Sequence, residues 1–95
     1  MEQILRFIRK TGKLKIGTMQ TIKSIRNVKA IILAKDYAGK QKIIKLAKRL
    51  NIEIIILDMT KEELGKVFDR GEVGIISIND ENLYKLFLKK RRESI

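Results

Sequence analysis

The spacing of apolar residues changes repeatedly along the chain between a helical and a strand-like period. Ile4, Leu5 and Ile8 form a stripe of helical spacing that stops near Gly12, so the first element is predicted to be a helix. Residues 14–16 then alternate between apolar and lysine side chains, which is the pattern of a short strand. The chain is therefore predicted to begin with a helix followed by a strand.

The next segment combines a helical pattern with an uninterrupted apolar run. Apolar residues at every third position, Met19, Ile22 and Ile25, predict an amphipathic helix over residues 18–27, with Gln20, Lys23 and Arg26 in solvent. The run over residues 30–34 is rich in β-branched side chains, as expected of a strand that is covered on both faces. A helix that leads into a buried strand is predicted here.

The second half of the chain continues this alternation. After a turn over residues 36–39, Thr60 followed by Glu63 is a capping box that opens a short helix, and Asn79 or Asp80 caps the last helix. The remaining predicted elements are helices over residues 41–50, 60–68 and from 80 onward, a turn over 69–72, and strands over 52–57, expected to be buried, and 73–78. Alternating helices and strands indicate an α/β sheet with helices on both faces.

Length and charge narrow the class of protein. A chain of 95 residues is expected to form a single domain over residues 1–95, because it has room for only one hydrophobic core. Apolar residues make up 44% of it, which is ordinary for a folded protein. Lys and Arg number 22 against 11 Asp and Glu, the net charge is +11, and a basic C-terminal tail is expected from about Lys89. This charge favours nucleic acid as partner over an acidic membrane surface, although lysine-rich surfaces also occur as solvated faces.

The residues available for catalysis are few. Cysteine and histidine are absent, which excludes disulfides, thiolate catalysis and cysteine-ligated metals and removes the commonest general base. Asp36, Asp58, Asp69 and Asp80 lie near predicted strand ends, where roles in turns and caps are favoured over acid–base chemistry. We therefore expect no enzyme, no cofactor and no metal.

The apolar runs are short and interrupted. Charged residues divide the first ten positions, so these lack the continuous hydrophobic stretch of a signal peptide. Runs such as residues 54–57 are far too short to span a membrane. A cytoplasmic protein without a membrane partner is expected.

Residues 17–23, with the sequence G-T-M-Q-T-I-K, are the most specific motif. They place a glycine, backbone amides, an amide side chain and a lysine on the opening turns of one predicted helix. N–H groups at a helix start bind phosphate or base acceptors, Gln20 can make paired hydrogen bonds to a base edge, and Lys23 can neutralise a phosphate. The motif thus suits nucleic acid, and the alternative is an ordinary helix start.

The order of several motifs resembles that of a known family. The segment at residues 17–23 is followed by A-I-I-L-A-K-D, by I-I-I-L-D-M-T with K-E-E-L-G-K after it, and by G-E-V-G before the last strand. This order is similar to that of the kink-turn-binding ribosomal proteins of the L-seven-Ae and L-thirty-e type, and the small bacterial members of that group are nearest in motif. The resemblance covers residues 14–78.

The resemblance implies a fold, a partner and a site. The fold would be a three-layer α/β/α sandwich around a four-stranded mixed sheet. The chain would act as a monomer on RNA that contains a kink-turn, a sharply bent internal loop closed by tandem sheared G·A pairs, such as ribosomal RNA, together with proteins of the ribosome or of another RNP. The implied RNA-binding residues are Gly17, Thr18, Met19, Gln20, Lys23, Lys35, Asp36, Glu63, Leu64, Gly65, Gly71, Glu72 and Val73.

The resemblance also implies individual roles for some of these residues. A kink exposes base edges that a regular RNA helix hides, so Gln20 would contact guanine edges, Lys23 phosphates and Val73 an unstacked base. Met19 departs from the family pattern, which usually has Asn or Lys at this place. This departure motivates a second hypothesis, a protein-interaction module on the same fold that binds RNA only through charge.

Overall fold

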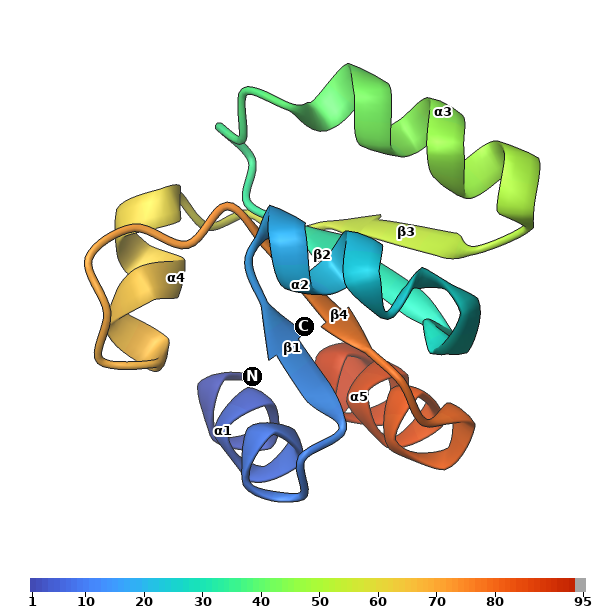
Figure 1. The fold of residues 1–95 in the computed structure, drawn as a ribbon. Coiled ribbons are helices and arrows are strands. Elements are labelled where there is room, and N and C mark those ends of the chain that lie inside the picture. Colours follow the sequence, from blue (N-terminus) through green and yellow to red (C-terminus); the bar gives the residue numbers. More distant parts are fainter. Residues whose placement is uncertain (94–95) are drawn as a thin grey trace.

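The computed structural model describes residues 1–93, which form a sheet between two layers of helices (Figure 1). In this part of the chain the elements are, in order, α1 (Glu2–Lys10), β1 (Leu14–Ile16), α2 (Thr18–Lys23), the 3₁₀ turn η1 (Ile25–Asn27), β2 (Ala30–Leu33), α3 (Lys40–Leu50), β3 (Glu53–Ile56), α4 (Lys61–Val67), β4 (Ile75–Ile78) and α5 (Glu81–Glu93). None of these described helices has the length and apolarity needed to cross a membrane. The predicted succession of helices and strands is confirmed.

The sheet is mixed, with the strand order β1-β4-β2-β3. β2 pairs in parallel with β3, and β4 lies antiparallel between β1 and β2. All residues of β2 and β4 are buried, which confirms the prediction for residues 30–34. The segment 52–57 was expected to be a buried strand as well, but it supplies the edge strand β3, in which Glu53 is exposed and Ile56 is 43% exposed. An edge strand has a neighbour on one side only, so its side chains are less covered.

Different helices cover the two faces of the sheet (Figure 1). On one face α1, α4 and α5 bury Leu5, Leu64 and Phe87 completely against the strands. On the other face α3 packs through Ile43. α2 lies over β1 and β4 and leads into η1. Ile25 of η1 packs against the same hydrophobic cluster as Ile43. The three-layer α/β/α sandwich that the resemblance implies is confirmed.

The helix predicted over residues 18–27 is shorter than expected and buries a different side. α2 ends at Lys23, after which the chain tightens into η1. Met19 is 68% exposed and Ile22 47% exposed, whereas Thr21 is completely buried. A step of three residues turns about 300° around an α-helix, so such a period drifts and defines no fixed apolar face. The prediction that Met19 and Ile22 face the core was wrong.

The boundaries of the last strand and helix also differ from the prediction. Residues 73 and 74 belong to a loop, so β4 begins at Ile75. Asp80 caps α5, because its Oδ1 accepts a hydrogen bond of 2.9 Å from the backbone N–H of Leu83. α5 continues through Glu93, and the basic cluster over residues 89–92, expected to form a tail, therefore makes up the last turns of a helix.

One edge of the sheet gathers several loops. Because β4 runs antiparallel to both β1 and β2, and β2 runs parallel to β3, the carboxyl ends of β1, β2 and β3 lie at the same edge as the start of β4. The segments at this edge are residues 17–18, 34–39, 57–60 and 68–74. Binding sites of α/β folds commonly form at the carboxyl ends of strands. The implied site residues all lie in these segments or in the adjoining helices α2 and α4.

Candidate nucleic-acid interface

Gly17 sets the direction in which α2 leaves the sheet. Its φ of +98° belongs to the left-handed region, which glycine adopts at low cost and other residues rarely adopt. Its N–H donates to the carbonyl of Ile75 over 2.9 Å, and its own carbonyl accepts from Thr21 N–H over 3.1 Å. The start of α2 is thus tied to the start of β4. Because α2 has only six residues, its dipole is small, and the exposed side chains must supply most of any binding.

Gln20 and Lys23 are the exposed polar side chains of this short helix. Positions three apart on an α-helix are neighbours on its surface, so the amide and the ammonium lie on one side. Met19 is also exposed and offers a thioether between them and Thr18. The structure therefore presents the motif to solvent, with the hydrogen-bonding groups that the sequence analysis assigned to a base edge and a phosphate.

Tyr37 joins two loops of the edge and was missed in the sequence analysis. Its hydroxyl lies 2.7 Å from the hydroxyl of Thr18, and the two groups share a hydrogen bond. Its ring occupies the space that a side chain at Gly74 would need, since a Cβ there would lie 2.3 Å from Cδ1 of the ring. The half-buried ring thus connects the loop after β2 with α2 and with the start of β4. An aromatic residue inside a predicted turn was the signal available in the sequence.

Lys35 and Asp36 connect the loop after β2 to the start of α4. Oδ1 of Asp36 accepts a hydrogen bond of 2.8 Å from the backbone N–H of Lys61, and the N–H of Lys35 donates to the carbonyl of Met59 over 2.9 Å. The Lys35 ammonium also lies 3.2 Å from Oδ1 of Asp58. This pair is exposed and contributes little to stability. The expected role in turns and caps is confirmed for Asp36, which holds two loops of the edge together.

Glu63 caps the helix on which it lies. The backbone N–H of Thr60 donates to Oε1 of Glu63 over 2.9 Å, and the N–H of Glu63 donates to the Thr60 hydroxyl over 3.1 Å, which completes the predicted capping box. The backbone hydrogen bond from Thr60 and then its side-chain hydrogen bond lower the pKa of Glu63. A carboxylate that is ionised and occupied in this way is suited to shaping the loop rather than to contacting phosphates.

Gly65 lets the loop after α4 pass unusually close to the helix. A Cβ at this position would lie 2.1 Å from the carbonyl oxygen of Gly71 and 2.8 Å from its carbonyl carbon. The carbonyl of Gly65 accepts a hydrogen bond of 2.9 Å from Arg70 N–H. The neighbouring Leu64 is completely buried in the core. Gly65 and Leu64 therefore fix the position of the loop from beneath and do not face solvent.

The loop at residues 70–73 exposes a different set of side chains from the one expected. Val73 is only 4% exposed, its N–H donates to the carbonyl of Lys61 over 3.0 Å, and its side chain packs in the core. The role of stacking against an extruded base is therefore not open to Val73 in this conformation, which corrects the sequence analysis. Arg70, Gly71 and Glu72 are the exposed residues of the loop.

A basic hollow runs along the outer edge of β1, beside α2. It has a volume of about 320 Å³ and is lined by Arg9, Leu14, Lys15, Ile16, Gln20 and Arg70. The charged residues lining it, within the part of the chain that is described, are all cationic. Arg9 is held in place because its Nη1 donates to the carbonyl of Phe68 over 3.3 Å and its guanidinium lies 5.7 Å from the centre of the Phe68 ring. The exposed amide of Gln20 therefore lies next to a cationic surface that suits phosphate groups.

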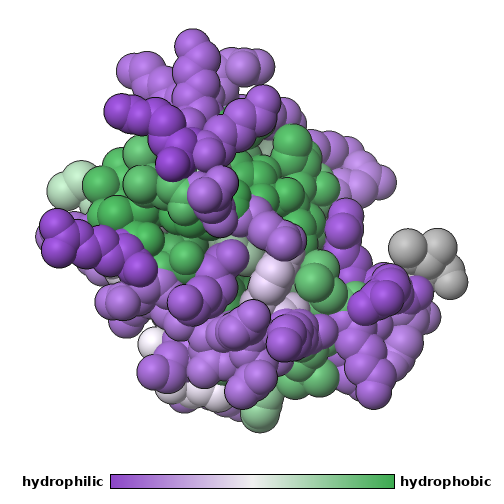
Figure 2. All heavy atoms as spheres, turned by 90° about the vertical axis from the view of Figure 1, so that its right-hand side faces the viewer, coloured by the Kyte–Doolittle hydropathy of each residue, from purple (hydrophilic) through white to green (hydrophobic). Residues whose placement is uncertain are grey.

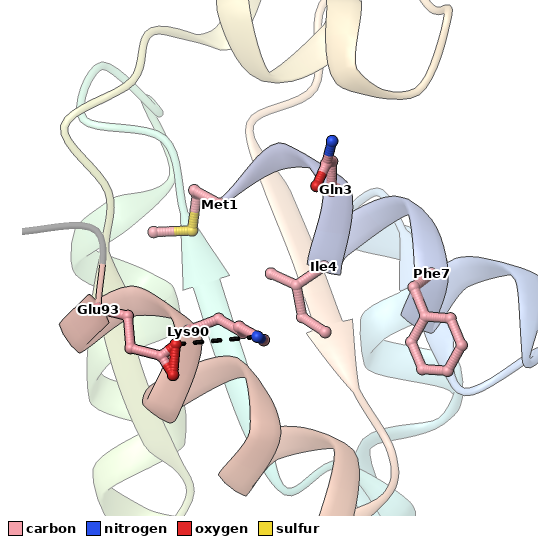
Figure 3. Close-up of a pocket in the computed structure, with 6 residues that line it drawn as sticks. All are labelled: Met1, Gln3, Ile4, Phe7, Lys90 and Glu93. Carbon is pink, nitrogen blue, oxygen red and sulfur yellow. Dashed lines mark ion pairs between the residues drawn. The ribbon is translucent and has the colours of Figure 1, made fainter.

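A second hollow, between α1 and α5, is not part of this surface. It is lined by Met1, Gln3, Ile4, Phe7, Lys90 and Glu93, and Figure 3 shows the side chains of Ile4 and Phe7 on α1 opposite the ion pair of Lys90 with Glu93 on α5. The Lys90 Nζ lies 3.8 Å from the Glu93 Oε2, so the two charges offset each other. The lining of this groove is therefore mixed, with the apolar residues Met1, Ile4 and Phe7 beside the polar Gln3 and the ion pair of Lys90 with Glu93.

The comparisons with known proteins agree with the fold and the motifs. The profile of the Ribosomal protein L7Ae/L30e/S12e/Gadd45 family matches residues 1–87. The chain is 29% identical over 84 residues to Large ribosomal subunit protein eL30 of Archaeoglobus fulgidus, in an alignment that covers 85% of this chain and 95% of the archaeal protein. A solved structure of a Bacillus halodurans protein of unknown function has the same fold, with a TM-score of 0.82 and 18% identity over 93% of this chain and 92% of that one. The chain belongs to the Ribosomal protein L7Ae/L30e/S12e/Gadd45 family.

Proposed function

We propose that this protein binds RNA without catalysing a reaction, that it recognises a kink-turn, and that it works in the ribosome or in another RNP. The observation that carries the proposal is the exposed pair Gln20 and Lys23 beside a hollow whose charged lining residues are Arg9, Lys15 and Arg70. Family membership and the likeness to eL30 of Archaeoglobus fulgidus support it.

The interface would act through shape as much as through sequence. A regular RNA helix has a deep, narrow major groove that side chains cannot read, whereas a kink opens base edges. Gln20 would donate to and accept from a guanine edge of the sheared pairs, and Lys23 would neutralise a neighbouring phosphate. Lys15 and Arg70 would hold the backbone of the strand that leaves the kink. The cap and loop contacts of Asp36, Glu63 and Gly65 would hold the loops that carry these side chains in position.

The carboxylates at the edge support a binding role rather than a catalytic one. Asp36 accepts a hydrogen bond from Lys61, and Glu63 accepts one from Thr60, so each is engaged in holding a loop or helix end. With histidine and cysteine absent from the sequence, these carboxylates have neither an imidazole base nor a thiol nucleophile to assist.

The experiment that tests the proposal follows the shape of the RNA. An RNA with a bulge and tandem sheared G·A pairs, carrying a donor and an acceptor dye on its two arms, should show increased energy transfer when protein is added in Mg²⁺-free buffer. A protein that binds the bent form better must shift the population toward it. Binding without a change in energy transfer would contradict kink-turn recognition.

Replacing Tyr37 by Phe should weaken RNA binding about fivefold while leaving the fold intact. The change removes only the hydroxyl that anchors Thr18, and one such hydrogen bond contributes about 1 kcal/mol. Fluorescence anisotropy with a kink-turn RNA measures the loss.

Tyr84→Phe is the matched control for Tyr37→Phe. The Tyr84 hydroxyl donates to Glu53 between α5 and β3, and burial, followed by this hydrogen bond, raises the pKa of Tyr84. Its removal should lower stability but not RNA affinity. An equal loss of affinity in both variants would mean that general loosening, and not the anchor at Thr18, explains the effect.

A further inference from the structure

A hollow with a partly aliphatic lining lies at the end of the sheet opposite the loops described above. It has a volume of about 520 Å³ and is formed by η1, the start of β2, the end of α3 and the start of β3. Its lining residues are Ile25, Arg26, Val28, Lys29, Leu50, Asn51 and Ile52. Figure 2 faces this side of the molecule and shows a broad hydrophobic area bordered by hydrophilic side chains.

Most apolar residues of this surface are exposed or half-buried. Leu50 is 48% exposed, and Ile22, one turn before Ile25, is 47% exposed. Ile25 and Ile52 are half-buried, and only Val28 is covered. Single exposed apolar residues are ordinary, but a contiguous group around a hollow marks an interaction surface. The surface therefore has the character of a docking site.

The charges around the hollow indicate the kind of partner. Arg26 and Lys29 are the charged residues that line it among residues 1–93, and the last turn of α3 adds Lys48 and Arg49 nearby. A second copy of the chain would bring the same basic residues and a net charge of +11 to the contact, which opposes self-association. Four of the seven lining residues are aliphatic, and such side chains offer RNA neither a hydrogen bond nor a ring for a base to stack on.

We propose that this surface docks an acidic amphipathic helix of a partner protein. Aliphatic side chains of the helix, at positions i, i+3 or i+4, and i+7, would fill the hollow against Leu50 and Ile25, and its carboxylates would meet Arg26 and Lys29. The hollow lies at the amino ends of β2 and β3, whereas the RNA interface lies at their carboxyl ends. Protein and RNA can therefore bind at the same time. This inference does not depend on the proposed RNA function.

A selection from a library of displayed 16-residue random peptides on the full chain tests the proposal. Enriched peptides should combine Asp or Glu with aliphatic residues at helical spacing. The most enriched peptide, made synthetically, should bind the unchanged protein at least tenfold more tightly than Leu50→Glu, because the variant loses a leucine side chain that the docked helix would bury and gains a charge of the same sign as the helix. Arg26→Glu, on an exposed residue, should reduce the affinity as well. Phe7→Glu on α1, where the side chain is 51% exposed, is the control and should leave it unchanged.

Each other outcome counts against the docking site. Enriched peptides that are basic, or that bind Leu50→Glu, Arg26→Glu and the unchanged protein equally, would overturn it. Displacement of the peptide by a saturating kink-turn RNA would overturn simultaneous binding and would point to one shared surface. A library that yields no binder at all would also contradict an exposed helix-docking groove.

Discussion

Gln20→Ala combined with Lys23→Ala should lower the affinity for a kink-turn RNA about 100-fold. A paired hydrogen bond to a base edge contributes about 1–3 kcal/mol, a phosphate contact adds to it, and each 1.4 kcal/mol corresponds to a factor of ten. Both side chains are exposed on the short helix α2, so their removal should leave the stability of the fold almost unchanged. Calorimetric titration at constant salt measures the loss.

The matched control for this pair lies on α5. Asn82 and Lys85 are exposed, are three positions apart like Gln20 and Lys23, and carry the same types of functional group. Replacing both by alanine changes the net charge by the same amount as the α2 pair. The α5 pair lies near the carboxyl end of β4, at the opposite end of the sheet from the proposed interface. If the α5 pair lowered the affinity as much as the α2 pair, binding would depend on total charge and not on the motif.

Gly65→Ala should lower the free energy of unfolding by about 2 kcal/mol, in spite of the better helix propensity of alanine. The added methyl group would lie 2.1 Å from the carbonyl oxygen of Gly71, and backbone atoms cannot move aside as a flexible side chain can. Either the end of α4 or the loop after it must shift. Because that loop carries Arg70, RNA affinity should fall as well. Urea unfolding followed by circular dichroism gives the stability.

Gly71→Ala changes the other partner of the same contact and serves as its control. A Cβ on Gly71 would meet no heavy atom within 4 Å, and its φ lies outside the left-handed region, so this variant should stay within about 0.5 kcal/mol of the unchanged protein. A Gly65→Ala protein that was as stable as Gly71→Ala would show that the close approach at Gly65 is unimportant.

The order of elements was predictable because each has a local pattern. The apolar stripe of α1, the capping box at Thr60 and the apolar run of β2 depend on nearby residues, and these three predictions were confirmed. The side that α2 buries was not predictable, since Thr21 is buried only because the sheet lies beneath it. The edge position of β3 likewise depends on the strand order, which no short segment of the sequence encodes.

Only the part of the candidate interface formed by the motif at residues 17–23 was predictable, because the side chains of this motif bear the hydrogen-bonding and charged groups themselves. Gln20 and Lys23 are exposed as the motif indicates. Arg9, Lys15 and Arg70 come from α1, β1 and the loop after α4, and only the packing of these elements brings them around one hollow. The burial of Val73 was not predictable from its sequence position, since an apolar side chain can pack against a base or in a core, and in this structure it packs in the core.

A titration against two RNAs shows whether the protein recognises a kink-turn. One contains the bulge and the tandem sheared G·A pairs, and the other is a duplex of matched length and composition without them, each at low and high salt. We expect a strong preference for the kinked RNA that persists at high salt, because base-edge contacts are less sensitive to salt than phosphate contacts. Equal binding to both RNAs that collapses at high salt would contradict it and would leave only the attraction of a chain with a net charge of +11.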